Sequence, residues 1–191
     1  MLADLHKGNA TIKMVAAPAD GKVYFTAGTS QTALSFADAE QIFTLKNSLS
    51  IAPADAEVNK IQIDQLDEVI DEEVNFGDYI INGNIPSIAQ ALLDYFFNVG
   101  ASSISQMVSG DTGLTYDGKG YFNAPKDIVV SMLIQSESKN TAIAFARVRV
   151  VVTPPSQDDS DNPAYLKFTG YVLNNLAESQ GDFAVLKKHT A

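Results

Sequence analysis

The sequence contains no cysteine and no tryptophan, and its only histidines are His6 and His189, close to the two ends of the 191 residues. Without cysteine the chain can form no disulfide, no thiolate nucleophile and no zinc–thiolate site. The two terminal histidines leave most catalytic triads and most transition-metal sites without their usual residue. We therefore expect no enzymatic activity, no cofactor and no bound metal.

Charged residues and long apolar segments are also scarce. Charged residues make up 19% of the chain, below the roughly 25% of an average domain, which suggests that other subunits cover part of the surface. No stretch approaches the roughly eighteen apolar residues of a membrane-spanning helix, and MLADLHKGNATIK at the N-terminus lacks the apolar run of a signal peptide. These absences predict production in the cytoplasm and no membrane partner.

The net charge of −10 is concentrated in one segment. Residues 55–78 contain nine acids and one base, Lys60, and so carry −8, whereas the rest of the chain is close to neutral. The simplest interpretation is a solvated acidic face. The alternative is a surface that repels polyanions or binds cations. Either interpretation disfavours electrostatic binding to DNA or RNA, because no basic stripe could neutralise phosphates.

Alternation of apolar and polar residues dominates the chain and predicts strands. Residues 10–26 read as a hairpin with a turn at 18–21, and further strands are expected at 73–81, 127–135, 142–153, 164–173 and 182–187. In 142–153, the alanines and valines at even positions should share one face. Residues 65–71 are expected to be a short helix or loop, and 109–125 a loop with a short hairpin around Asp117 and Gly118.

One helix is predicted over residues 87–98. Ser87 and Gln90 have capping-box spacing, and Gly100 is a natural end. Leu92 and Phe96 fall on its apolar face, and a second helical turn is possible at 102–108. The fold class expected is therefore mainly β, an antiparallel sandwich or partly closed barrel with one flanking helix, in a single domain spanning 1–191.

Two groups of charged residues are candidates for contacts between subunits. Arg147 and Arg149, the only arginines, lie two residues apart on one strand face and are expected to pair with the acidic residues of 64–73, within or between subunits. The long loop 153–163 is stiffened by prolines and should project onto a neighbour. Its acids lack the spacing of an EF-hand, so we prefer an exposed contact loop to a calcium site; they are Asp158, Asp159 and Asp161.

The chain resembles the tail tube proteins of bacteriophages in the order of its elements. The likeness rests on the strands AIAFARVRVVV and YLKFTGYVL, the helix SIAQALLDYFF and the acidic stretch at 55–78. The resemblance implies a structural virion protein of the tail that self-assembles into hexameric rings, joins its sheets around an inner barrel and stacks into a tube. Other tail proteins would be its partners.

The same resemblance implies an acidic lumen through which DNA passes without binding. The candidate acids for that lumen are Glu68, Asp71, Glu72 and Glu73. Three alternatives remain open: a capsid decoration or head-completion protein, an extracellular or periplasmic β-sandwich that binds carbohydrate, and an enzyme of unrecognised type. For the carbohydrate alternative, a stacking platform would come from the aromatic residues of 109–125, namely Tyr116, Tyr121 and Phe122.

Overall fold

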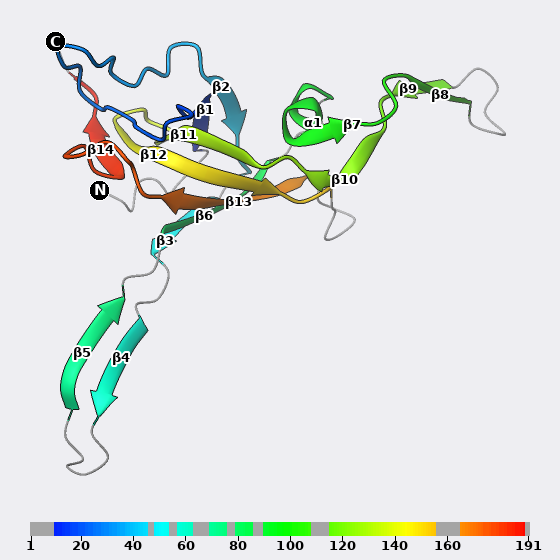
Figure 1. Cartoon of the computed structure of the whole chain (residues 1–191). Coiled ribbons are helices and arrows are strands. Elements are labelled where there is room, and N and C mark those ends of the chain that lie inside the picture. The colour runs from blue at the N-terminus through cyan, green and yellow to red at the C-terminus, as the bar shows by residue number, and fades with distance from the viewer. Residues whose placement is uncertain are drawn as a thin grey trace.

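A computed structural model describes residues 10–45, 48–53, 57–62, 69–75, 79–85, 90–107, 115–155 and 165–189. As the alternation predicts, the fold is mainly β with antiparallel pairing (Figure 1). The elements of the described residues are, in chain order, β1 (Thr11–Ala16), β2 (Glu40–Phe43), β3 (Ser50–Pro53), β4 (Glu57–Gln62), β5 (Val69–Asn75), β6 (Tyr79–Ile85), α1 (Gln90–Phe96), β7 (Phe97–Val99), β8 (Ile104–Met107), β9 (Thr115–Gly118), β10 (Tyr121–Pro125), β11 (Ile128–Gln135), β12 (Thr141–Val152), β13 (Leu166–Leu173) and β14 (Phe183–Lys187).

An eight-stranded sheet forms the body of the molecule, in the order β2-β1-β11-β12-β13-β6-β3, with β14 paired to β12. Its two terminal strands, β2 and β3, are consecutive in the chain. Between them, the N–H of Leu45 donates to the carbonyl of Asn84 on β6 (2.8 Å), and Thr44 Oγ1 donates to the carbonyl of Ala10 (3.2 Å). The segment from β2 to β3 thus crosses from one end of the sheet to the other, as in a partly closed barrel.

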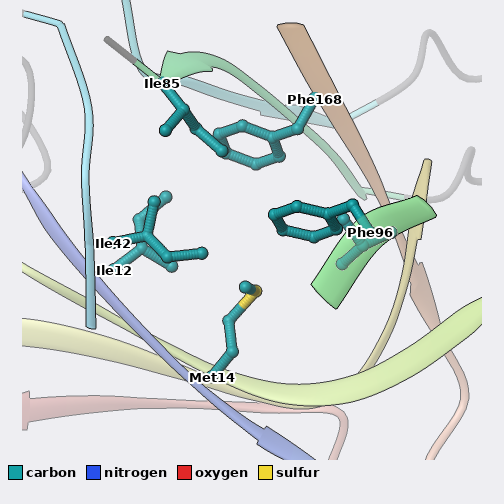
Figure 2. A pocket seen from close by; sticks show the side chains of 7 residues that line it. Ile12, Met14, Ile42, Ile85, Phe96 and Phe168 are labelled. Carbon is teal, nitrogen blue, oxygen red and sulfur yellow. The ribbon is translucent and has the colours of Figure 1, made fainter. Parts of the chain in front are cut away.

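The core lies on the concave side of this sheet, under α1. Phe96 at the end of α1 points toward Met14, Ile85 and Phe168, which come from three different strands (Figure 2). These side chains, with their neighbours, line an apolar cavity of only about 10 Å³, at the lower limit of what one water molecule needs. The helix is therefore held by burial of its last turn in the barrel.

The helix ends earlier than the sequence predicts, and its buried face is shifted. It ends at Phe96 rather than at 98, and the next three residues form β7; residues 86–89, including the expected cap Ser87, lie outside the described part of the chain. Leu93 and Phe96 are its buried residues, whereas Leu92 is half-buried. Aromatic Phe97 has little helix preference, and it is buried as the first residue of a strand.

A bulge in β12 overturns the predicted division of its faces. Val130 pairs with Val148 and Met132 with Phe145, so two residues of β12 face Ser131 of β11. Ser131 is fully buried, and its hydroxyl donates to the carbonyl of Ala146 (2.7 Å). The extra residue reverses the alternation: Ile143 and Phe145 join Val148, Val150 and Val152 in the core.

Three further predictions of local structure are wrong, because strand pairing replaces the expected elements. Residues 22–26 form no strand, and β1 pairs with β11 and β2, although the turn at 18–21 is present, with Gly21 at φ 71°. Residues 69–75 are the strand β5, although a short helix or loop is expected up to residue 71. Residues 104–107 are the strand β8, not a helical turn.

Two ribbons project from the barrel (Figure 1). The first is the antiparallel pair β4–β5, which follows β3 and precedes β6. In the second, β7 pairs with β10 and β8 pairs with β9, so residues 97–107 run beside 115–125 as one bent ribbon. The described residues of the expected loop, 115–125, are therefore mostly strand, and Asp117 and Gly118 lie inside β9.

Candidate assembly surfaces

One edge of β12 is shared by two strands in succession. Residues 147–152 pair with β13, and residues 141–145 pair with β14. Beyond β13 the sheet continues into β6 and β3. In the described part of the chain no strand pairs with the far side of β14, which is consequently an open edge of the main sheet.

The backbone of Val185 faces this open edge. The N–H of Ala146 donates to Asp182 O, and the N–H of Lys188 donates to Asn140 O, across the ends of the β12–β14 ladder. Ala146–Asp182 and Asn140–Lys188 are therefore hydrogen-bonded pairs. In an antiparallel ladder, hydrogen-bonded pairs alternate with pairs whose peptide groups point away from each other. With the register Phe145–Phe183, Ile143–Val185 and Thr141–Lys187, the peptide groups of Phe183, Val185 and Lys187 point away from β12.

The side chains of this strand are apolar and exposed. Val185 is 52% exposed, and Phe183 and Leu186 are also exposed. Phe183 lies edge-on to Tyr79 at the start of β6, with ring centroids 5.4 Å apart, so the exposed apolar surface extends from β14 to β6. An unpaired strand with apolar side chains is a template for another strand. We call Tyr79 with Phe183, Val185 and Leu186 the β14 edge.

A second exposed apolar residue lies on the terminal strand β2. Phe43 is 59% exposed at the end of this strand. Four antiparallel steps separate β2 from β14 (β2-β1-β11-β12-β14), so the two strands run in the same direction. Beside β2, a cleft of about 250 Å³ is lined by residues of α1, among them Leu92 and Tyr95.

The predicted acidic segment corresponds to the β4–β5 ribbon. Asp71, Glu72 and Glu73 are residues of β5, and the register places Glu72 opposite Lys60. Glu68 lies outside the described residues, as do Asp158, Asp159 and Asp161 and most of the loop 153–163. The structure thus gathers three of the four candidate lumenal acids on one projecting strand.

The two arginines contact other groups than the expected acids. Arg147 Nη1 donates to the carbonyl of Asn174 at 2.7 Å, and Arg149 Nε lies 3.1 Å from Asp127 Oδ1. The Arg149–Asp127 pair is well exposed, and such pairs contribute little to stability. A pairing of these arginines with residues 64–73 stays a prediction for contacts between subunits.

A polar cluster that the sequence analysis did not anticipate joins α1 to the bent ribbon. Asp94 accepts hydrogen bonds from Lys119 Nζ at 2.6 Å and from the Tyr121 hydroxyl at 2.8 Å, while Lys126 Nζ donates to its carbonyl at 2.6 Å. The bonds from Lys119 and Tyr121 hold the pKa of Asp94 below its ordinary value. The carboxylate is therefore ionised at neutral pH. The only sequence signal was that Asp94 interrupts an otherwise apolar helix.

The sequence contains one signal for the β14 edge. FAVLK places apolar residues on both faces of a short terminal strand, and a strand of that kind needs cover on two sides.

The aromatic residues considered for sugar stacking do not form one platform. The Tyr121 hydroxyl donates to Asp94, whereas Tyr116 and Phe122 are exposed.

Comparisons with known proteins add no family to these observations: no family model matches the chain, and no curated protein matches it in sequence. Within the residues that the structure describes, no three metal-ligating side chains form a group, and no helix has the length and apolar character needed to cross a membrane.

Proposed function

We propose that this chain is a self-assembling structural subunit, a phage tail tube protein whose rings stack into a tube for DNA. The observation that carries the proposal is the β14 edge, where outward peptide groups coincide with exposed apolar side chains. The likeness in element order to tail tube proteins supports the same assignment.

The proposed partner of the β14 edge is the outer edge of β2 in a second copy, where Phe43 is exposed. We call this surface the β2 edge. Pairing two different surfaces is heterologous, and such contacts form a ring when the rotation between neighbouring copies closes. Because β2 and β14 run in the same direction within one copy, the new pair between neighbouring copies would be parallel. Burial of Phe43 and Val185 would supply the hydrophobic contribution.

Val185→Pro tests this surface without disturbing the subunit. Proline lacks the N–H that would bond a neighbouring strand, yet the N–H of Val185 faces away from β12, so no internal ladder bond is lost. We expect Val185→Pro to be a folded monomer by circular dichroism and sedimentation velocity. The matched control, Val185→Thr, keeps the N–H and the branched side chain and should assemble like the unmodified protein.

Mixing two blocked variants distinguishes the heterologous contact from a symmetric one. Phe43→Asp blocks the β2 edge, and Val185→Pro blocks the β14 edge. Each alone should be monomeric, and the mixture should form one-to-one dimers because each variant supplies the surface that the other lacks. If Phe43→Asp alone forms dimers, the β14 edge pairs with itself, and the ring contact proposed here is wrong.

A lumenal position of the acidic ribbon predicts sensitivity of DNA passage to its charge. Replacing Glu68, Asp71, Glu72 and Glu73 by lysine changes the local charge by +8 per subunit, a change that every subunit of a ring repeats. DNA should then be retained by assembled tubes at low salt and released as salt rises. Tubes that still do not bind DNA at low salt would place these acids on the outer wall instead.

The carbohydrate-binding alternative has one supporting observation. Phe122 is exposed beside a cleft of about 190 Å³ that is also lined by Leu93, Phe97, Pro154 and Pro155. The chain contains no tryptophan, so sugar binding cannot be followed by tryptophan fluorescence. Glycan-array binding with a Phe122→Ala control is the suitable assay. Binding that Phe122→Ala abolishes would favour this alternative.

A further inference from the structure

The bent ribbon changes direction at a glycine-rich junction. Gly100 donates its N–H to Gly120 O, and Gly120 donates its N–H to Ala101 O, both at 2.8 Å. Two residues of one strand thus share a single partner on the other, an irregularity that bends a ribbon and interrupts its ladder. Backbone freedom is greatest at glycine, so this junction is the part of the ribbon most able to pivot.

The junction is tied to α1 through Lys119, which lies between Gly118 and Gly120. Its ammonium group reaches Asp94 Oδ2 at 2.6 Å. On the barrel side of the junction, the Tyr121 hydroxyl bonds to Asp94 Oδ1, and Lys126 bonds to the helix through both its side chain and its N–H. The inner part, β7–β10, therefore has several attachments to α1, whereas among the described residues the Lys119–Asp94 contact is the ionic attachment at the bend itself.

From this arrangement we propose that the Lys119–Asp94 ion pair is a latch that sets the angle between the outer ribbon, β8–β9, and the barrel. With the latch closed, the outer ribbon is held in one direction. When it opens, β8–β9 swings about the Gly100–Gly120 junction while β7–β10 stays attached through Tyr121 and Lys126. The inference rests on the contacts of α1 and does not depend on the proposed function.

The exposure of the pair allows the latch to open. The side chains of Lys119 and Asp94 are each about one-third exposed (32% and 35%). Partly exposed ion pairs are weak and are screened by salt. The open arrangement should therefore be reachable by a single substitution or by high salt, without unfolding of the barrel.

The absence of cysteine makes a distance measurement straightforward. Spin labels on Asp117→Cys in β9 and Lys167→Cys in β13 report the angle of the outer ribbon by double electron–electron resonance in the full chain, made monomeric with Val185→Pro. Both positions are exposed. We expect a narrow distance distribution at low salt, which broadens on Lys119→Met and on addition of about 1 M salt, where the Debye length is only about 3 Å.

Two further variants make the result decisive. Lys119→Arg keeps the charge and should retain the narrow distribution. Asp127→Asn removes a second exposed ion pair, Arg149–Asp127, and should leave the distribution unchanged. If Lys119→Met gives the same narrow distribution as the parent, or if Asp127→Asn broadens it equally, the ion pair does not set the angle and the proposal is overturned.

Discussion

Phe96→Ala is expected to destabilise the subunit by about 3–5 kcal/mol, the range for removing a buried phenylalanine. Phe96 is 1% exposed, packs edge-to-face on Tyr95 and already borders a small apolar cavity. Truncation would join the lost ring volume to that cavity, and the paired strands around it can collapse little to fill it. The free energy of unfolding from urea melts of the monomeric Val185→Pro background measures the effect.

The control for Phe96→Ala is the same change at an exposed phenylalanine. Phe122 is 60% exposed, so Phe122→Ala should alter the free energy of unfolding by no more than about 0.5 kcal/mol. A loss below about 1 kcal/mol for Phe96→Ala would mean that the helix does not close the core in the way described.

Asn175→Ala is expected to cost about 2–4 kcal/mol by leaving polar backbone groups without partners. Asn175 Oδ1 accepts from the N–H groups of Val23 and Ala177, and its Nδ2 donates to the carbonyls of Val23 and Gly181, at 2.8–3.1 Å. One side chain thus fixes the irregular segment after the 18–21 turn to the connection between β13 and β14.

Thermal unfolding in the monomeric Val185→Pro background tests the hydrogen bonds of Asn175, with an exposed asparagine as the control. Asn140→Ala changes the same residue type at an exposed turn position and should shift the melting temperature little. Equal shifts in melting temperature for the two variants would show that the hydrogen bonds of Asn175 add nothing to stability. A larger shift for Asn175→Ala would also explain how the backbone of residues 22–26 is held in place without pairing to a strand.

The boundaries of the last four strands were predicted well. Those of β11, β12, β13 and β14 lie within about two residues of expectation, because each is a mostly apolar run bounded by polar or turn residues. Of the four, β13 also alternates cleanly between buried and more exposed residues. The helix was predicted from its apolar face, but its predicted end lies two residues beyond Phe96. Phe97 satisfies a helical spacing and a strand equally well, and only contact with β10 decides between them.

One failure arises because the decisive partner is far away in the chain, whereas β5 and β8 pair with the nearby strands β4 and β9. Residues 10–26 look like a hairpin locally, yet β1 finds β11 more than one hundred residues later. The bulge in β12 depends on Ser131 of another strand, and no local pattern of alanines and valines encodes it. The β14 edge and the Asp94 latch are likewise products of three-dimensional placement, since each joins segments that are unrelated in the sequence.

Electron microscopy of the unmodified protein at high concentration, beside Val185→Pro, tests the central claim most directly. Self-assembly through the β14 edge predicts rings or tubes for the unmodified chain and isolated subunits for the variant, with Val185→Thr forming the same rings or tubes. An unmodified protein that stays monomeric at every concentration, or a Val185→Pro variant that forms normal tubes, would contradict the account.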